Sequence, residues 1–336
     1  MSGHSVSETS EERFDGYRET INSGLGAVRE LSRDFSLGIG SPVRQIKRLR
    51  KEIDEADAIV IGGGAGLSTS AGLSYAGARY SDYFTDFARE FGIHDMYSGG
   101  FHRFPDEETY WAWWSRSIYC NRYVDPPKPV YNRLRELVDD KDYFVVTTNV
   151  DHQFQRAGFD KSRLFYTQGD FGVFQSRYGA GLPTVDNEDA ILQMVEAQGF
   201  VKDDDGVYRM PEDKNVAMRV PTELIPRHPE DGGEVVPHLR SDDTFVENDG
   251  WKQASHAYGM FLREHEGKHI LFWEIGVGDN TPVIIKYPFW QMTRDNPNAF
   301  YACVNREQAF CPVDIEERSA CIIGDAGELF NRLLTL

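Results

Sequence analysis

Several features are scarce or missing in this sequence, and each absence excludes a class of protein. Only four of the 336 residues are cysteines, and no two of them form a C-x-x-C pair, so a cysteine zinc site or a disulfide framework is not predicted. No stretch approaches the roughly 20 consecutive apolar residues that cross a bilayer. Lysine and arginine (36) are outnumbered by aspartate and glutamate (54), which gives a formal net charge of −18. Because such a surface repels phosphate backbones and anionic lipids, we expect neither nucleic acid nor membrane among the partners.

The N-terminus lacks the features of a targeting peptide. Its first 16 residues, MSGHSVSETSEERFDG, are polar and acidic, without an apolar core or an arginine-rich stretch. We interpret residues 1–42 as an N-terminal extension that is partly disordered and then helical. Together with the few unpaired cysteines, this favours the reducing cytoplasm, with the mitochondrial matrix as the alternative.

Apolar runs alternate with helical segments along most of the chain. Each run is followed by glycine or a polar residue; they lie at 57–64, 142–151, 163–170, 269–280, 298–305 and 319–327. The segments with helical periodicity lie at about 43–55, 107–123, 129–139, 252–265 and 327–334. Runs that are apolar on both faces suit buried parallel strands. Their alternation with helices predicts an α/β fold with a Rossmann-like, doubly wound parallel sheet.

Two regions depart from this alternation. Residues 75–105 are rich in aromatic side chains and glycine, and we expect a flexible or helical insertion over a site. Residues 170–250 are long, polar and loop-rich, with VKDDDGVYR (201–209) typical of a β-hairpin. We therefore predict a Rossmann-like domain formed by 43–169 and 251–336, with 170–250 as a smaller inserted module.

The glycine-rich stretch IGGGAGLSTSAGLSYAG (61–77) directly follows the first predicted strand. Glycine lets backbone N–H groups approach a phosphate closely. The Walker pattern is excluded because no lysine follows these glycines. The dehydrogenase pattern G-x-G-x-x-G also fails, since counting from Gly64 puts Thr69 at the third glycine position. The loop therefore predicts a nucleotide phosphate without the usual hydride-transfer signature.

Polar residues and glycines also follow the other predicted strands. They are Asn149 and Asp151, Gln168, the group Gly276, Gly278 and Asp279, then Asn305, and finally Asp325. In open α/β sheets, ligands bind outside the carboxyl ends of the strands. One such residue is an ordinary turn residue, but a polar group at every strand end indicates a binding site.

These segments together resemble the sirtuin family over about residues 45–335. The similar stretches are GAGLSTSAG (64–72), TTNVDHQFQRAG (147–158), GVGDNTP (276–282), NRE (305–307) and GDAGELFNRLL (324–334). The loop tail at Leu73-Ser74-Tyr75 and the Gln168-Gly169 pair depart from deacetylase sirtuins, which have I-P-D and H-G there. FTDFAREFGIHDMYSGGF (84–101), PTELIPRHPEDGG (221–233) and LRSDDTFVE (239–247) resemble the macrodomain-linked class, class M.

The resemblance implies NAD as co-substrate and NAD-dependent mono-ADP-ribosylation of a protein. It implies a lipoylated, glycine-cleavage H-like carrier as target and a macrodomain hydrolase as functional partner. The implied catalytic residues are Asn149, Asp151 and Gln168. The implied NAD-binding residues are Gly64, Ala65, Gly66, Ser68, Gly72, Tyr75, Arg79, Gly276, Val277, Gly278, Asn305, Arg306, Asp325 and Ala326. Among these, we expect Ala65, Gly66 and Ser68 to hold the pyrophosphate, and Tyr75 and Arg79 to close over the nicotinamide ribose.

Gln168 favours one chemistry over another. Deacylation needs a base that deprotonates a ribose hydroxyl, and histidine can do this near pH 6.5. Glutamine can only donate and accept hydrogen bonds. An aspartate or glutamate acceptor is already ionised at pH 7 and can attack C1′ of the ribose unaided. We therefore expect ADP-ribose transfer to an acidic side chain, with release of nicotinamide.

Two alternatives and a missing metal complete the interpretation. One alternative is a deacylase that uses another base, such as His152, and the other is a catalytically silent NAD or ADP-ribose sensor. Aligned with class M, the usual zinc-ligand positions become Ser176, Ala180, His228 and Asp231. Serine and alanine are poor zinc ligands, so we predict a degenerate zinc-ribbon-like module without zinc.

Overall fold

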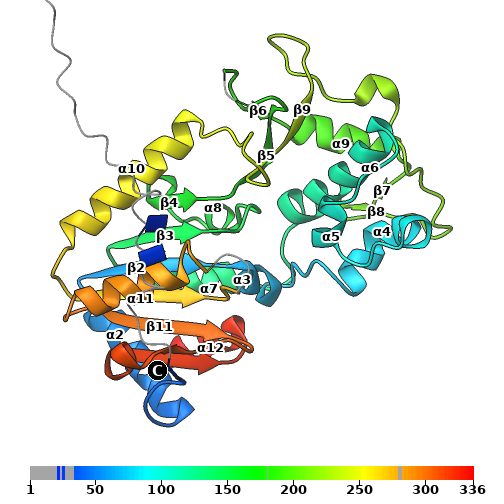
Figure 1. The fold of residues 1–336 in the computed structure, drawn as a ribbon. Coiled ribbons are helices and arrows are strands. Elements are labelled where there is room, and N and C mark those ends of the chain that lie inside the picture. Colours follow the sequence, from blue (N-terminus) through cyan, green and yellow to red (C-terminus); the bar gives the residue numbers. More distant parts are fainter. Residues whose placement is uncertain (1–20, 23–24, 27–33, 180, 279–281) are drawn as a thin grey trace, which may run out of the picture.

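A six-stranded parallel sheet forms the centre of the protein, for which the computed structural model describes residues 21–22, 25–26, 34–179, 181–278 and 282–336 (Figure 1). Its strands are β2 (Ala58–Gly63), β3 (Tyr143–Thr147), β4 (Leu164–Tyr166), β10 (Ile270–Ile275), β11 (Phe300–Asn305) and β13 (Ser319–Ile323). The strand order is β13-β11-β10-β2-β3-β4. The first strand of this sheet in chain order, β2, thus lies inside it, and the chain builds outward from β2 in both directions. This doubly wound order confirms the predicted fold class.

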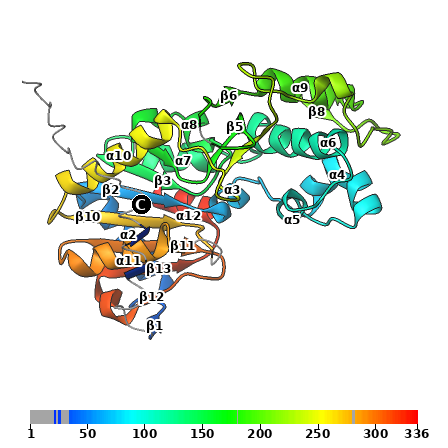
Figure 2. The ribbon, with the colours of Figure 1, turned by 45° about the horizontal axis from the view of Figure 1, so that its top comes forward.

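Strand β2 shows why the sheet is covered on both faces. Its side chains alternate, with Ile59 and Ile61 in one buried cluster and Ala58 and Val60 in another. The first cluster packs under helices α2 (Pro42–Glu55), α7 (Val130–Leu137) and α12 (Ala326–Leu333). The second packs under α10 (Asp249–Glu264) and α11 (Lys286–Asp295) (Figure 2). The apolar runs therefore face helices on both sides, as buried parallel strands do.

A second lobe lies beside the carboxyl end of the sheet (Figure 1). Its helices are α4 (Ala78–Phe91), α5 (Met96–Gly100), α6 (Glu107–Ile118) with a π-helical turn at Tyr119–Tyr123, and α9 (Glu188–Ala197). Its strands are β5 (Gly169–Ser176), β6 (Val185–Asp186), β7 (Val201–Lys202), β8 (Tyr208–Arg209) and β9 (Val235–Leu239). One buried cluster joins aromatic residues between 80 and 120 with apolar residues between 171 and 235. The two segments that depart from the strand–helix alternation thus share a core.

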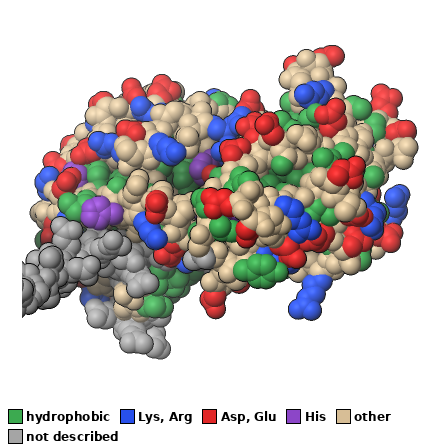
Figure 3. Space-filling model, turned by 90° about the horizontal axis from the view of Figure 1, so that it is seen from above, with side chains coloured by type: hydrophobic (Ala, Val, Ile, Leu, Met, Phe, Trp, Pro, Cys, Tyr) green, Lys and Arg blue, Asp and Glu red, His purple; other side chains and the backbone are tan. Residues whose placement is uncertain are grey.

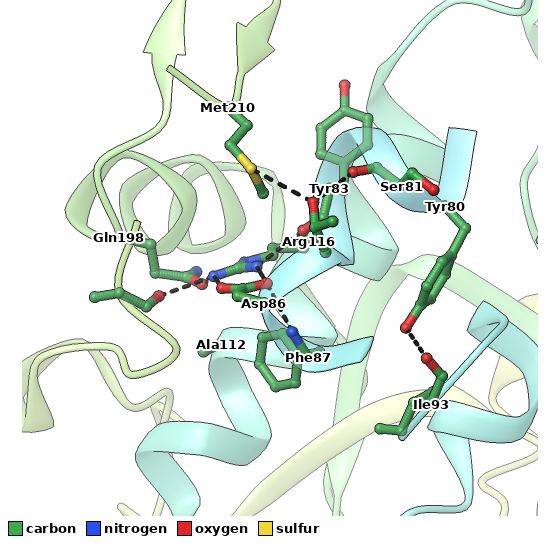
Figure 4. A network of polar contacts seen from close by, with 12 residues as sticks. Tyr80, Ser81, Tyr83, Asp86, Phe87, Ile93, Ala112, Arg116, Gln198 and Met210 are labelled. Atoms are coloured by element: carbon green, nitrogen blue, oxygen red, sulfur yellow. Dashed lines mark hydrogen bonds and ion pairs between the residues drawn. The ribbon is translucent and has the colours of Figure 1, made fainter. Parts of the chain in front are cut away.

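A buried ion pair lies inside this lobe (Figure 4). The guanidinium of Arg116 binds both carboxylate oxygens of Asp86, at 2.7 and 2.9 Å, and Arg116 is fully buried. Its Nε donates to Gln198 Oε1 at 2.7 Å. The guanidinium also lies 4.9 Å from the ring centroid of Phe87 and 5.0 Å from that of Phe200. One side chain therefore connects α4, α6 and the end of α9.

The structure corrects the sequence interpretation at two helices. Residues 188–197 form α9 inside a region interpreted as loop-rich, and 286–295 form α11, for which no helix is predicted. The predicted hairpin is confirmed, because Val201 pairs with Arg209 in an antiparallel register. For residues 75–105 we expect a flexible or a helical insertion, and α4 and α5 confirm the helical alternative. The division at 169/170 and 250/251 stays a prediction, and most of the extension 1–42 lies outside the described residues.

The surface agrees with an acidic chain. On the face shown in Figure 3, aspartate and glutamate side chains are scattered among lysine and arginine. Within the described ranges, no helix is both long and apolar enough to cross a membrane.

Candidate functional site

Glycines bring two loops into direct contact between β2 and β10. At this point the order in which strands are added to the sheet reverses. Gly64 and Gly66 follow β2, and Gly276 follows the neighbouring strand β10. A Cβ on Gly66 would lie 2.8 Å from Gly276 Cα, and one on Gly64 would lie 2.6 Å from Val277 Cα. Gly276 itself has φ +65°. Only glycine permits this approach, which places both loops at the switch point where α/β proteins bind ligands.

The contact between the two loops includes the N–H of Gly66, which sequence analysis expects to bind pyrophosphate. The N–H of Gly66 donates to the carbonyl oxygen of Gly276 at 2.8 Å. In this structure the N–H of Gly66 joins the two loops, and its expected part in holding pyrophosphate stays a prediction. Ala65 and Gly66 are exposed beside the contact, and exposed Gly278 has no atom within 4 Å of an added Cβ. Predicted Asp279 lies outside the described residues.

A small pocket of about 90 Å³ opens at the carboxyl ends of the strands. Its lining residues are Gly66, Thr69, Gly276, Val304, Asn305, Arg306, Gly324 and Ala326. Asp325 caps helix α12 by accepting from Glu328 N and pairs with Arg306 at 2.7 Å. Burial opposes ionisation of Asp325, but the Arg306 guanidinium holds its pKa below the usual value. The residues predicted for the adenosine half are thus neighbours.

A buried hydrogen-bonded cluster lies next to the glycine contact. The Oγ of Ser68 donates to Asp151 Oδ2 at 2.6 Å and lies 2.8 Å from the hydroxyl of Tyr131. The side-chain nitrogen of Asn149 lies 3.0 Å from Gly64 O, 3.1 Å from Ser68 Oγ and 3.2 Å from Tyr131 Oη. All four polar side chains are buried. The structure therefore places Ser68 beside the two candidate catalytic residues, whereas sequence analysis expects Ser68 to hold the pyrophosphate.

Local structure explains how Asn149 reaches this position. Thr147, the last residue of β3, donates its hydroxyl to Gly63 O at 2.7 Å and accepts the N–H of Asn149 at 3.0 Å. The chain thus turns as soon as the strand ends. Asp151 Oδ1 accepts from Gln153 N at 3.2 Å at the start of α8 (Gln153–Arg156). Local hydrogen bonds thus hold both residues in place.

The charge of Asp151 reflects opposing influences. Burial raises the pKa of Asp151, and the hydrogen bond from Ser68 and the charges of Arg79 and Arg122 act in the opposite direction. The pKa of half-buried Tyr75 is also raised, first by burial and then by the charge of Asp151. Tyr75 therefore stays a neutral hydroxyl beside a carboxylate.

The loop that carries Tyr75 is attached to the second lobe. Arg79 donates to Ser74 O at 3.1 Å and to Asn121 Oδ1 at 2.8 Å, and it also binds Cys120 O. Arg79 thus fastens the loop to the π-helical turn. Gly72 has φ +96°, and an added Cβ would lie 2.9 Å from Pro127. The part expected for Arg79 over a ribose stays a prediction.

Gln168 and His152 occupy different surroundings. Half-buried Gln168 lies at the end of β4, with its Nε2 3.5 Å from Thr167 Oγ1. Buried His152 has φ +57°, stacks on Tyr166 at 3.8 Å between ring centroids, and places Nε2 3.0 Å from Asp170 Oδ2. Burial lowers the pKa of His152 to about 4. His152 is therefore neutral near pH 7 and lies against Asp170.

The residues aligned with zinc positions make protein contacts. Buried His228 has Nε2 3.0 Å from Pro183 O and accepts Glu230 N at Nδ1. Asp231 accepts from Gly233 N, and Ala180 lies outside the described residues. No three His, Cys, Asp or Glu side chains in the described part of the chain gather as metal ligands would. The prediction of a zinc-free module stays a prediction.

Comparison with known proteins identifies the family. A protein ADP-ribosyltransferase of Staphylococcus aureus (strain Mu50) is 35% identical over 301 residues, which cover 89% of this chain and 90% of that protein. The chain belongs to that family. A probable bifunctional ADP-ribose hydrolase/ADP-ribosyltransferase of Fusarium oxysporum f. sp. cubense is 26% identical over 88% of the chain, which spans only 48% of that longer protein. No family model matches the chain.

Solved structures agree with this family at the level of fold. A Sir2 homologue in complex with NAD has a TM-score of 0.54 and 16% identity, with 86% of this chain and 92% of that chain covered. A mutant Sir2 homologue in complex with ADP-ribose has a TM-score of 0.52 and 16% identity, covering 86% and 95%. The chain thus has a Sir2-like fold and belongs to the protein ADP-ribosyltransferase family, as its sequence predicts at this coarser level.

Sequence analysis missed one member of the buried cluster. Tyr131 lies near the start of α7, 18 residues before Asn149, in a segment that shows only the apolar periodicity of a core helix. The available signal was a tyrosine at a core position, since a buried hydroxyl usually has a hydrogen-bond partner.

Proposed function

We propose that this protein is an NAD-dependent protein mono-ADP-ribosyltransferase that transfers ADP-ribose to an acidic side chain. The observation that carries the proposal is the buried cluster of Asn149, Ser68 and Asp151 beside the Gly66–Gly276 contact, with glutamine at 168. These residues fit a dinucleotide, because the glycines leave room for a close backbone approach and the polar cluster lies next to the pocket. Its relative in S. aureus carries the name of this activity.

The reaction needs one bond broken and one bond formed. The bond between C1′ and the nicotinamide nitrogen breaks, and its electron pair leaves on that nitrogen. A carboxylate oxygen of the acceptor forms the new bond to C1′. Because the acceptor is already ionised at pH 7, no proton has to move. This is consistent with Gln168, which can orient hydroxyls but cannot act as a base.

The chain's residues would act by position. Asp151 would accept a hydrogen bond from the nicotinamide carboxamide, and Asn149 would hold the ribose hydroxyls or an ordered water. Gln168 would orient the ribose. Asn305 and Arg306, which line the pocket, would surround the adenosine half.

We also propose the finer assignment to the macrodomain-linked class M, with a lipoylated H-like carrier as target and a macrodomain hydrolase as the enzyme that removes the mark. The motifs at 84–101, 221–233 and 239–247 support this assignment. The bifunctional name and greater length of the Fusarium relative are consistent with it.

The test is to incubate the protein with labelled NAD and a lipoylated H-like carrier. We expect label on the carrier and free nicotinamide, and we expect Asn149→Ala to lower both at least about 100-fold, as loss of a positioned polar group does. Asn298→Ala is the matched control, because the side chain of Asn298 is exposed and donates to Gly267 O, away from the site.

Other outcomes separate the alternatives. Release of acyl-ADP-ribose from an acylated peptide would indicate a deacylase. Binding of NAD without nicotinamide release would indicate a sensor. Labelling of another protein while the carrier stays unlabelled would refute only the proposed target.

A further inference from the structure

Tyr131 belongs to the same hydrogen-bonded group as the candidate catalytic residues, although it comes from a different layer of the fold. It lies in α7, on the face of the helix that packs against the sheet, and is 2% exposed. Its ring packs edge-on against Phe154, with 4.9 Å between ring centroids. Its hydroxyl therefore has a fixed position under the carboxyl end of β3.

The direction of the hydrogen bonds follows from the number of protons available. Ser68 has one hydroxyl proton, which it donates to Asp151 Oδ2 at 2.6 Å. Ser68 Oγ must then accept from Tyr131, whose Oη lies 2.8 Å away. Burial raises the pKa of Tyr131 well above its usual value, so this hydroxyl keeps its proton. The donors thus run from Tyr131 to Ser68 to Asp151.

Asn149 supports the same arrangement from the side. Its amide nitrogen donates to Gly64 O at 3.0 Å, which fixes one of its two protons. The second proton points at Ser68 Oγ and Tyr131 Oη, at 3.1 and 3.2 Å. The hydroxyls of Ser68 and Tyr131 are therefore oriented by neighbours, and their freedom to rotate is small.

Building on the proposed function, we propose that Tyr131 is a positioning residue of the NAD-cleaving centre. Its hydroxyl orients Ser68, and Ser68 keeps Asp151 ionised and aimed as the acceptor for the nicotinamide carboxamide. A hydrogen bond from an oriented donor favours the charged form of a carboxylate, and donors in a chain strengthen one another.

Among the described residues, no other group that faces Asp151 can replace the hydrogen bonds from Tyr131 to Ser68 and from Ser68 to Asp151. Arg79 of α4 and Arg122 of the π-helical turn act on Asp151 by charge alone. Tyr75 and Tyr166 are neutral, because burial raises the pKa of each. The neighbouring His152 lies against Asp170. Ser68 is thus the side-chain donor to Asp151 in the described part of the chain.

The test is the pH profile of nicotinamide release by full-length Tyr131→Phe. Phenylalanine keeps the ring and removes the donor, so the acid limb of kcat/KM should move upward by about one pH unit. The Kd for ADP-ribose should stay within about twofold. Tyr143→Phe is the matched control, because Tyr143 is equally buried but its hydroxyl accepts from Asp160 N, away from the cluster.

A second variant separates positioning from general damage. Ser68→Ala should shift the acid limb at least as far, because it removes the donor itself. Tyr131→Phe added to it should cause no further shift, because Tyr131 acts through Ser68. If Tyr131→Phe does not fold, Ser68→Ala alone must show the shift or the proposal fails. An active Tyr131→Phe with an unmoved acid limb overturns the proposal outright.

A readout without catalysis distinguishes this proposal from the proposed function. If the wild type releases no nicotinamide, the proposed function fails. The titration of Asp151 can then be followed by the carboxyl stretch in infrared difference spectra against Asp151→Asn. A midpoint that rises by about one pH unit in Tyr131→Phe supports the positioning role, and an unchanged midpoint refutes it.

Discussion

The buried pair of Arg116 and Asp86 gives a sharp prediction about stability. Asp86→Ala would remove both carboxylate oxygens from a guanidinium that is fully buried. The remaining acceptors, Gln198 Oε1, Tyr83 O and Ala217 O, are neutral. Stranding one member of a buried pair costs about 3–5 kcal/mol. We expect the free energy of unfolding to fall by that amount.

The measurement is urea unfolding followed by circular dichroism and by tryptophan fluorescence. Asp54→Ala is the control, because Asp54 pairs with Arg50 one helical turn away at the surface of α2 and should cost at most about 0.5 kcal/mol. Arg116→Met combined with Asp86→Ala should cost less than the sum of the two single changes, because no charge is left stranded.

The reasoning is refuted if Asp86→Ala costs no more than Asp54→Ala, or if the two changes at the pair are additive. Either result would mean that water or a rearranged neighbour takes the place of the carboxylate. The aromatic packing of Phe87 and Phe200 around the guanidinium would then account for the stability of the lobe.

Two further predictions concern the loops and the pH response. Gly276→Ala should prevent NAD binding and destabilise the fold, because the new Cβ would lie 2.4 Å from Leu67 N. Gly250→Ala in α10, whose new Cβ would have its nearest neighbour at 3.5 Å, should bind NAD normally in calorimetry. Burial lowers the pKa of His152 from 6.5 to about 4. Between pH 4 and pH 6.5 the unfolded chain therefore binds more protons than the folded protein. The unfolding free energy should therefore fall by up to about 3 kcal/mol as the pH drops from 6.5 to 4, and His152→Asn should flatten this slope in urea titrations; an unchanged slope would contradict the buried neutral histidine.

The parallel sheet was predictable because its strands are apolar on both faces. Helix α9 was not predictable, because its short segment EDAILQMVEA lies within a long polar region and buries only Ile191, Met194 and Val195. Its stability comes from packing on α6, which local sequence does not report. Helix α11 was not predictable either, because IIKYPFWQM (284–292) is apolar on most sides and shows no clear helical period.

The candidate site was predictable in part for a similar reason. Glycines and strand-end polar residues carry a local signal, so Asn149, Asp151 and Gly276 could be found from the sequence. The bond from Ser68 to Asp151 spans 83 positions and depends on how the layers pack. The Gly66–Gly276 hydrogen bond also depends on two loops meeting in space.

The shared core of the second lobe has a consequence for protein engineering. The lobe takes aromatic residues from 80–120 and apolar residues from 171–235, while strands β3 and β4 of the central sheet come between them in the chain. A gene fragment that encodes only 170–250 would express Phe171, Ile191 and Phe200 without the aromatic residues of 80–120 that share their buried cluster. To excise the lobe, an engineer would have to join residue 123 to residue 169 with a new linker.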